Sequence, residues 1–299
     1  MKLLCIGHAA YDTTVPVVQY PVENTKNRVE IRLENGGGPA NNAAYLLGKW
    51  GMDVTLAGIV GKDLHGKKIQ EELESVGVST KYLEHNPDHI TTSSFIIANM
   101  ENGSRTILTY RPSAMVMKDV TLDFEPDIIL IDGQEYEFSK KILTANQKAI
   151  SIIDAGRPVE EVIELCHMVD YVVSSKEFAE EVTGITLIED DMESFKQLYL
   201  KMETIFQTNI VVTLEAKGCL YRYQNKIKLM PSLKVKAVDS TGAGDIFHGA
   251  FTYGIANNYD YEDVLKIANI AGAISVTRVG SRNSMPTKEE MRMYYHDFK

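Results

Sequence analysis

The stretch VDSTGAGDIFHGAFTYG, residues 238–254, decides the fold of this chain. Gly242, Ala243 and Gly244 open a segment whose apolar residues recur at helical spacing, namely Ile246, Phe247, Ala250, Phe251, Gly254 and Ile255. A glycine-rich helix start leaves backbone N–H groups free at the positive end of the helix dipole. We therefore predict that residues 242–244 bind phosphate oxygens and stabilise developing negative charge.

Asp245 falls in the first turn of this predicted helix. A carboxylate at that position either caps the helix and compensates its dipole, or acts as a base held beside the anion site. The spacing alone leaves both interpretations open.

A second glycine-rich segment, NGGGPANNAAYLLGKWG, covers residues 35–51. Its glycines, including Gly38, allow a close approach of backbone to ligand, and Pro39 can start a helix. Asn41 and Asn42 then lie at the helix start, where their amides can donate to and accept from sugar hydroxyls. The alternative is a plain glycine turn with asparagine caps.

Short β-branched runs alternate with helix-length amphipathic segments along the chain. The runs are KLLCIG, DVTLAGIVG, DIILID, AISIID, YVVSS and NIVVTLE. This alternation predicts an α/β fold, a doubly wound and mostly parallel sheet with helices on both faces. No repeat, low-complexity tract or linker interrupts it, so we expect a single domain over residues 1–299.

Residues 14–34 and 92–110 break this rhythm, and each is typical of a hairpin, the second turning on Asn102 and Gly103. Two inserted hairpins can pair into a small sheet over the strand ends, where ligands of open α/β sheets bind. We expect them to form a β lid and not a second domain.

Single residues near these motifs carry weaker signals. Asp12 follows the first predicted strand and either accepts hydroxyl hydrogens or caps a loop. Asp63 is expected to cap a helix. Glu177 begins a helix and either reaches magnesium through water or pairs with the helix dipole. His248 is close to the predicted anion site, but a core position explains it equally.

Composition narrows the class of partner. The chain has 299 residues, 44% hydrophobic and 24% charged, with a net charge of −10 and no basic run longer than two residues. We therefore expect neither a nucleic-acid nor a membrane partner. The start MKLLCIGHAAYD is too short in apolar residues for a signal peptide core, so we expect a cytoplasmic protein. Cys5, Cys166 and Cys219 are expected to be reduced core residues.

Two common nucleotide-binding patterns are absent from the sequence. IGHAAYD after the first strand is not GxGxxG, and GxxxxGK followed by Ser or Thr does not occur. This excludes the classical dinucleotide-binding fold and the P-loop class.

Together, GGGPANNAA followed by GIVGKD, and VDSTGAGDIFHGAF about two hundred residues later, resemble the two signatures of the ribokinase-like carbohydrate kinases, the PfkB family. The resemblance covers essentially the whole chain. It implies ATP-dependent phosphorylation of a sugar hydroxyl, with Asp245 as general base and the amides of Gly242, Ala243 and Gly244 as anion hole. It also implies that the acceptor is held by Asp12, Gly38 and either Asn41 or Asn42, of which Asn41 is the better match.

The resemblance extends to the nucleotide and its ions. Thr213 and Gly218 in VTLEAKG match the nucleotide loop, and Asn269 matches a residue of the adenine pocket. Asp239 and Thr241 match positions near a monovalent cation site, which implies K⁺ beside Mg²⁺ as a candidate cofactor. Two positions depart from the family pattern: Ser174 replaces an asparagine three residues before the magnesium-linked Glu177, and Glu215 replaces a glycine.

The acceptor is left open by the sequence. DGQEYE (132–137) and DAGRP (154–158) are similar to a branch that includes ketohexokinase-like proteins, which favours a ketose. A phosphorylated sugar would need cations at the lid, for which the candidates are Lys26, Arg28, Arg105 and Arg111. A nucleoside would need aromatic stacking, for which Tyr20 and Phe95 are candidates. A catalytically silent sugar-binding protein and a homodimer formed through the lid also stay open.

Overall fold

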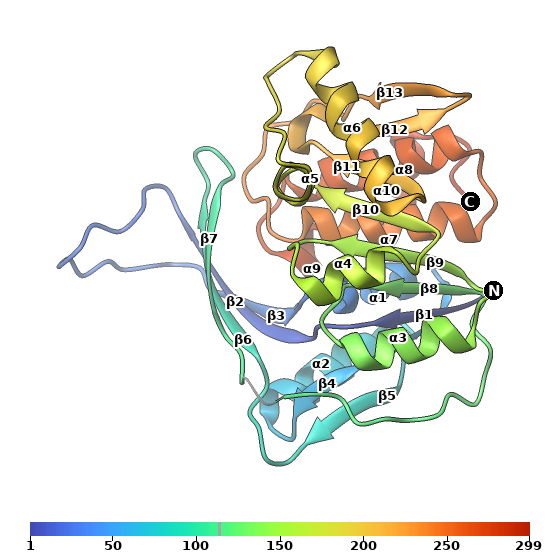
Figure 1. Ribbon diagram of the computed structural model, residues 1–299. Helices are drawn as coiled ribbons and strands as arrows, with labels where there is room; N and C mark the ends of the chain where they lie inside the picture. Colours follow the sequence, from blue (N-terminus) through green and yellow to red (C-terminus); the bar gives the residue numbers. More distant parts are fainter. Residues whose placement is uncertain (113–114) are drawn as a thin grey trace.

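The computed structural model describes residues 1–112 and 115–299, and shows a layered α/β body from which a small sheet projects (Figure 1). Within the described residues the central sheet has the order β13-β12-β11-β10-β9-β8-β1-β4-β5. Its strands are β1 (Lys2–Ile6), β4 (Asp53–Gly61), β5 (Ser79–Asn86), β8 (Ile128–Ile131), β9 (Ile150–Ala155), β10 (Tyr171–Ser175), β11 (Asn209–Thr213), β12 (Cys219–Tyr223) and β13 (Lys226–Met230). All pairings from β5 to β11 are parallel, and β12 and β13 add an antiparallel edge. The predicted fold class is confirmed.

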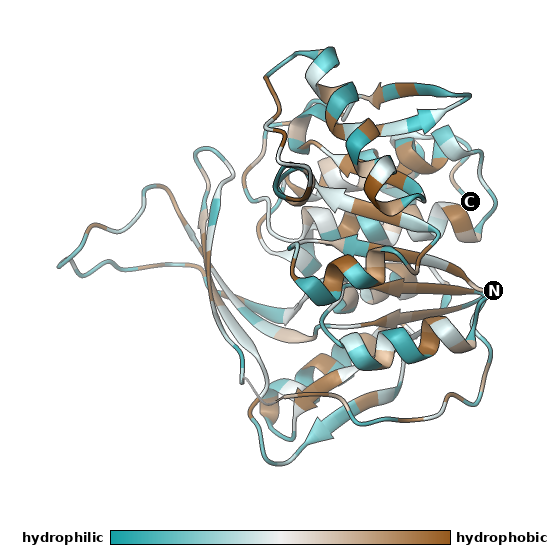
Figure 2. Cartoon of the chain, in the orientation of Figure 1, coloured by the Kyte–Doolittle hydropathy of each residue, from teal (hydrophilic) through white to brown (hydrophobic). Residues whose placement is uncertain are grey.

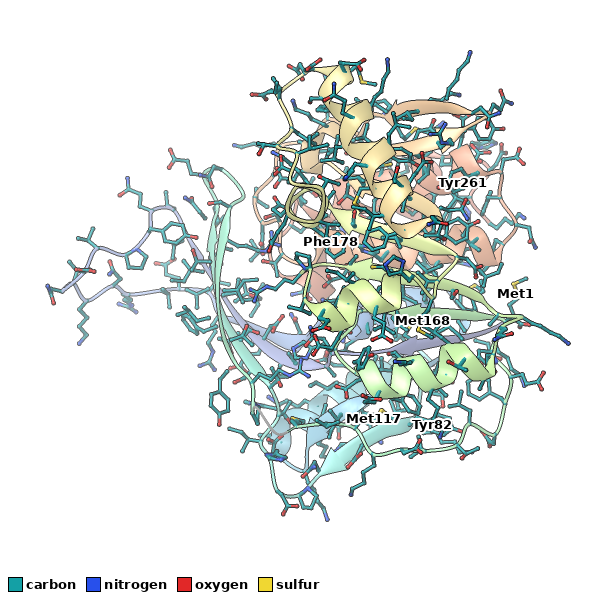
Figure 3. The ribbon with its side chains drawn as sticks, viewed as in Figure 1. Met1, Tyr82, Met117, Met168, Phe178 and Tyr261 are labelled. Atoms are coloured by element: carbon teal, nitrogen blue, oxygen red, sulfur yellow. The ribbon has the colours of Figure 1, made fainter. Side chains whose placement is uncertain are left out.

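Alternation along the strands divides the core into two apolar layers. In β1, Leu3 and Cys5 belong to one layer, while Leu4 and Ile6 belong to the other. Both faces of the sheet are therefore covered. Its central strands, such as β1 and β8, are mostly apolar (Figure 2), whereas the edge strands β5 and β13 carry polar residues. Figure 3 labels Tyr261 from the first layer and Phe178 from the second.

Helices cover each face. The first layer is completed by α1 (Pro39–Lys49), α2 (Leu64–Ser75), α7 (Ala243–Ala256), α8 (Tyr261–Ser275) and α10 (Lys288–Tyr294). The second is completed by α3 (Tyr136–Ala145), α4 (Glu160–Cys166), α5 (Lys176–Thr183) and α6 (Met192–Phe206). A short helix, α9 (Ser281–Ser284), precedes α10. Cys5, Cys166 and Cys219 are free and buried, as predicted.

Local sequence explains where several helices begin. Pro39 occupies the first turn of α1, where its missing N–H costs nothing. Asp63 caps α2 by accepting from the Gly66 N–H at 2.9 Å, as predicted. Thr287 and Glu290 form a capping box at the start of α10.

The small sheet has the order β3-β2-β6-β7, built from β2 (Ala10–Val17), β3 (Leu33–Gly37), β6 (Ser93–Asn99) and β7 (Arg105–Tyr110). Each expected hairpin pairs antiparallel, and β2 pairs with β6 in parallel to join them. The prediction was wrong about the first hairpin's bounds. Its strands start at Ala10 and end at Gly37, because the glycine-rich run pairs with β2, and residues 18–32 contain no strand.

The small sheet lies beside the carboxyl ends of the parallel strands (Figure 1). There β1 is flanked by β4 on one side and β8 on the other, so successive connections run in opposite directions from this point. Such a switch point is where open α/β sheets bind ligands. No described helix combines the length and the hydrophobicity that a bilayer crossing requires.

Candidate active site

Helices α1 and α7 pack side by side through small residues. A Cβ on Gly249 of α7 would lie 3.2 Å from Ala43 Cα and 3.1 Å from Leu46 Cδ2 of α1. This close approach aligns the starts of the two helices. The Asn42 side-chain amide then donates to Asp245 Oδ2 at 2.7 Å, across 203 residues of sequence.

The start of α7 presents free donors beside the Asp245 carboxylate. Gly242 has φ of +76°, a left-handed conformation that glycine adopts without strain. Ala243 N–H donates to Ser240 O at 3.3 Å, whereas the N–H groups of Gly242 and Gly244 have no protein acceptor in the described chain. Two of the three predicted anion-binding amides are therefore open to a ligand.

Asp12 lies within strand β2 of the small sheet, and not at the carboxyl end of the first strand as predicted. Its carboxylate occupies the space that a side chain at position 37 would need, since a Cβ on Gly37 would lie 1.9 Å from Asp12 Oδ2. Burial raises the pKa of Asp12 to about 6, opposed by a hydrogen bond with Ser94 and strengthened by the charge of Asp245. The charge of Asp245 therefore acts directly on the Asp12 carboxylate.

Gly38, Asn41 and Asn42 line the same region. Gly38 has φ of +96°, and a Cβ there would lie 2.5 Å from the His8 carbonyl oxygen. The Asn41 amide donates to Gly37 O at 2.9 Å. The side-chain oxygens of both asparagines are buried without a hydrogen-bond partner among the described residues. These oxygens are available to hydroxyl donors.

Two acidic residues beneath the site, Asp132 and Asp154, begin the stretches DGQEYE and DAGRP, and the sequence pointed to no site role for either. Asp132, at the end of β8, accepts from the His8 and Ala40 N–H groups at 2.7 and 3.1 Å, which ties β1 to α1. Asp154, at the end of β9, lies 3.2 Å from His248 Nδ1. Burial raises the pKa of Asp154 to about 7, opposed by His248.

His248 is buried and contacts only acceptors. Its Nδ1 lies 2.6 Å from Gly244 O, and its Nε2 lies 3.0 Å from Val173 O. His248 therefore joins the first turn of α7 to strand β10.

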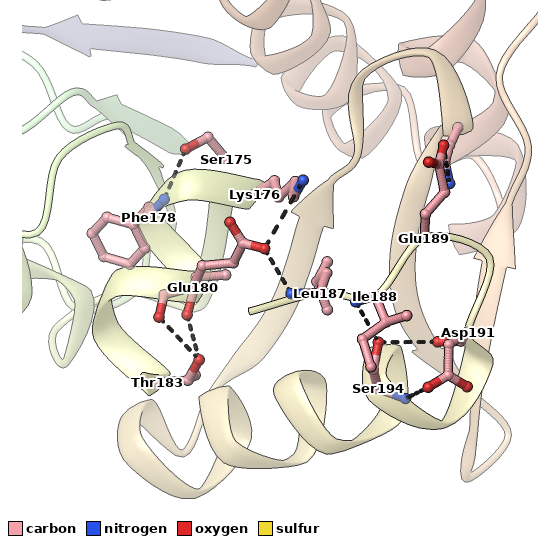
Figure 4. A network of polar contacts seen from close by, with 12 residues as sticks. Ser175, Lys176, Phe178, Glu180, Thr183, Leu187, Ile188, Glu189, Asp191 and Ser194 are labelled. Carbon is pink, nitrogen blue, oxygen red and sulfur yellow. Dashed lines mark hydrogen bonds and ion pairs between the residues drawn. The ribbon is translucent and has the colours of Figure 1, made fainter. Parts of the chain in front are cut away.

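The start of α5 borders a cleft of about 540 Å³. Ser175 caps the helix by accepting from the Phe178 N–H at 3.1 Å (Figure 4). Glu177 is exposed and lines the cleft together with Arg105 and Arg157. Further along, Glu180 accepts from the Leu187 N–H at 2.7 Å and thereby fixes the loop that follows α5.

The remaining predicted nucleotide residues lie around β10 to β12. Ser174 is fully buried with an unpartnered hydroxyl, and Thr213 Oγ1 donates to its carbonyl oxygen at 3.2 Å. Gly218 has φ of +105°, and a Cβ there would lie 1.8 Å from Met230 O. Asn269 Nδ2 lies 3.4 Å from Cys219 Sγ. Buried Ser174 is thus placed to support the loop and not to contact a ligand directly.

Asp239 organises the loop before α7. One carboxylate oxygen accepts from the Thr241 N–H at 2.9 Å and its hydroxyl at 2.6 Å, and the other accepts from the Gly280 N–H at 2.8 Å. The residue is 1% exposed and has no ion-pair partner in the described structure. No three His, Cys, Asp or Glu side chains of the described residues gather into a metal cluster.

The tip of the β6–β7 hairpin touches this same loop. Ser240 N–H donates to Gly103 O at 3.0 Å, and Arg105 Nη1 donates to Ser240 Oγ at 2.7 Å. Arg111 instead lies 3.3 Å from His8 Nδ1 and 3.7 Å from Glu135 Oε1. Burial raises the pKa of Glu135 to about 7, and Arg111 opposes that shift.

The other lid candidates lie away from this centre. Lys26 and Arg28 are exposed in the segment 18–32. The Tyr20 hydroxyl lies 2.9 Å from Thr106 Oγ1, and Phe95 is 45% exposed on β6. None of these four side chains has a hydrogen bond or ion pair with Asp12 or Asp245 in the described structure.

Comparisons with a family model, with curated relatives and with a solved structure all find kinases. The model of the pfkB family carbohydrate kinases matches residues 1–288. A ribokinase from Bacillus subtilis is 27% identical over 85% of this chain and 86% of its own length. A nucleoside kinase from Methanocaldococcus jannaschii is 23% identical over 97% of this chain and 95% of its own length. The structure of Arabidopsis thaliana ribokinase complexed with ribose and ATP superposes with a TM-score of 0.78 at 22% identity, covering 100% of this chain and 99% of that one.

The buried Asp12 carboxylate should cost stability when it is charged. Moving its pKa from 3.8 to about 6 corresponds to about 3 kcal/mol. This cost is fully present above pH 6 and is lost as the pH falls towards 3.8. We predict that Asp12→Asn raises the free energy of unfolding in urea by about 3 kcal/mol at pH 8 and by about half as much at pH 5.

The matched control is Asp88→Asn in an exposed turn, which should change stability by less than about 0.5 kcal/mol at both pH values. An Asp12→Asn protein that is less stable than the wild type at pH 8 would contradict this account of Asp12.

Proposed function

The chain belongs to the pfkB family of carbohydrate kinases, and on that premise we propose that it transfers the terminal phosphoryl group of ATP to a hydroxyl of a monosaccharide, a ketose being favoured. The observation that carries the proposal is the position of Asp245. Its carboxylate is held by Asn42 at 2.7 Å and stands in the first turn of a helix whose leading amides are open. A base beside an anion-binding helix start is the arrangement that hydroxyl phosphorylation requires.

In the proposed reaction, Asp245 accepts the proton of the attacking hydroxyl as the oxygen bonds to phosphorus. The amides of Gly242, Ala243 and Gly244 stabilise charge on the transferred group, and ADP leaves. Phosphoryl transfer places negative charge on the equatorial oxygens, so positioning and charge stabilisation supply most of the catalysis. Asp12, Gly38, Asn41 and Asn42 are proposed to hold the acceptor.

The nucleotide is proposed to lie along the β10–β12 side, bordered by Glu177, Thr213, Gly218 and Asn269, while buried Ser174 supports this side from beneath. Glu177 supports this position because it is exposed into the cleft that Arg105 and Arg157 also line. Mg²⁺ held by Glu177 through water would neutralise charge between the phosphates. The ATP complex of the plant relative supports ATP as donor.

The small sheet is proposed to act as a lid that excludes water from the acceptor. Asp12 supports this role because it reaches the site from β2. The lid also exposes apolar side chains, Phe95, Ile107, Leu108 and Tyr110, which would suit pairing with a second copy of the chain.

A nucleoside is the second candidate acceptor, favoured by the likeness to an archaeal nucleoside kinase. A phosphorylated sugar is a third, since Arg105 and Arg111 contact the site region from the lid. A catalytically silent sugar-binding protein would need no base, so consumption of ATP that depends on a sugar would exclude it.

Replacing the proposed base should separate binding from chemistry. With ATP and a panel of sugars, sugar phosphates and nucleosides, the wild type should show ATP consumption that depends on a sugar. We predict that Asp245→Asn retains the affinities for sugar and ATP but loses at least about 100-fold in kcat, because only proton transfer is removed. Near-normal kcat in that variant would reject Asp245 as the base.

Lid closure should be visible by amide exchange. A bound sugar should protect residues 14–34 and 92–110 more than helices α8 and α10, because the acceptor contacts the lid and not the C-terminal helices. Mass spectrometry of exchange with and without sugar measures this difference. Equal protection of both regions would argue against a lid.

Potassium is proposed to order the loop that carries Asp239 and Thr241. The support is a buried carboxylate with no cationic side chain paired to it in the described structure. We predict a lower initial rate when potassium is replaced by tetramethylammonium at constant ionic strength, with Mg²⁺ and ATP saturating. An unchanged rate would leave Asp239 and Thr241 with a structural role only.

A further inference from the structure

Arg282 is a buried cation next to the proposed acceptor site. It lies on α9, is 5% exposed, and its guanidinium stacks over the Tyr45 ring with the central carbon 4.0 Å from the ring centroid. Its Nε donates to Gly36 O at 3.0 Å. Nη1 and Nη2 are buried without any hydrogen-bond partner in the described chain. Leaving such donors unpaired costs stability, so a ligand or water must complete them.

The unpaired end of Arg282 faces the glycine-rich loop of the acceptor site. A Cβ on Gly36 would lie 2.7 Å from Arg282 Nη2 and 3.1 Å from Asn41 Nδ2. Glu72 is 3.9 Å from Nε, but its nearest oxygen already accepts the Gly36 N–H at 2.8 Å. Glu72 Oε2 would also lie 3.1 Å from that Cβ, so only a glycine at 36 lets the Arg282 guanidinium, Asn41 and Glu72 come this close together.

The charges that act on Arg282 include both carboxylates of the site. Burial lowers the pKa of Arg282 to about 10, while Glu72, Tyr45, Asp12 and Asp245 oppose the shift. Arg282 therefore stays charged at neutral pH. It forms no ion pair with Asp12 or Asp245 in the described structure, although both carboxylates act on it.

The unsatisfied groups have a composition that matches hydroxyls. The unpartnered donors are the two terminal nitrogens of Arg282, and the unpartnered acceptors are the side-chain oxygens of Asn41 and Asn42. The Asp12 carboxylate, which already has a hydrogen bond with Ser94, is a further acceptor. A hydroxyl group both donates and accepts, whereas a phosphate or carboxylate only accepts. An anionic group here would also meet Asp12, Asp245 and Glu72 with a single guanidinium to balance them.

We propose that Arg282 is an acceptor-binding residue, whose Nη1 and Nη2 donate to oxygen atoms of an uncharged polyhydroxylated acceptor while Asp12 and Asn41 accept its hydroxyl hydrogens. The inference rests on the proposed kinase function and narrows its substrate class. Arg282 thereby selects neutral sugars against sugar phosphates at this end of the site.

The test compares Arg282→Gln and Arg282→Lys with the wild type. The matched control is Arg278→Gln, which removes an arginine that pairs with Glu290 in the segment before α9. The probes are D-ribose, D-fructose, their monodeoxy derivatives, D-ribose 5-phosphate and adenosine. Initial rates give KM for each acceptor and for ATP, and calorimetry with an imido analogue of ATP gives sugar affinity.

One lost hydrogen bond to a charged group corresponds to about 10- to 150-fold in affinity. Arg282→Gln should therefore weaken the preferred sugar by at least about 10-fold, with the KM for ATP unchanged, and Arg278→Gln should change neither. The wild type and Arg282→Gln should have almost equal affinity for the one deoxy sugar that lacks the oxygen bound by Arg282. If Arg282 only supported the structure, Arg282→Gln would bind the parent sugar and every deoxy sugar more weakly than the wild type by a similar factor.

Arg282→Lys keeps the charge and serves if Arg282→Gln does not fold, as judged by melting temperature and binding of the ATP analogue. It should weaken the parent sugar but still spare the same deoxy sugar. Unchanged sugar affinity in folded variants, or equal losses for the parent and every deoxy sugar, would overturn the role of Arg282. Preference of the wild type for D-ribose 5-phosphate would overturn the proposal that the acceptor is an uncharged sugar. A wild type inactive with every sugar would reject the proposed function itself.

Discussion

The close packing of α1 against α7 is the contact on which the site depends. The two helix starts are separated by about two hundred residues of sequence, and only a glycine at 249 lets the backbones approach within reach of Ala43 and Leu46. That approach places the Asn42 amide on the Asp245 carboxylate. A larger residue at 249 would push the helices apart, because cores this tightly packed have no free volume to absorb a new side chain. Asp245, the open amides and the asparagines would then no longer lie together.

Glycines elsewhere in the site likewise leave space for buried carboxylate side chains. Asp132 fills the space beside Gly7, and Asp12 fills the space beside Gly37. Both carboxylates are buried, and burial raises the pKa of each, as it does for Asp154. A fold selected for stability alone would not bury three acids near one switch point. Their presence fits a site that gives up stability to hold ligand-binding groups in place.

The local features of the site could be predicted from the sequence, and its long-range contacts could not. The helix starting at Ala243, the one starting at Pro39 and the cap at Asp63 each follow from neighbouring residues. Asp12 was predicted wrongly at the end of the first strand, because AYDTTVPV follows that strand so closely. It instead belongs to a second strand that pairs with the glycine run of residues 35–37. Arg282 in TRVGSRNS gave no signal, because its burial comes from Tyr45 and Gly36, more than two hundred residues away.

The hairpin tip connects the two halves of the site. Gly103 and Arg105 bond Ser240, which lies between Asp239 and the open amides of α7. Asp239 in turn holds Gly280, whose neighbour Ser281 begins the helix that carries Arg282. A displacement of the lid therefore acts on the loop before α7 directly, and through Asp239 on the segment that positions Arg282. Such a chain of bonded loops has the means to couple the proposed acceptor binding at the small sheet to the geometry of the open amides of α7.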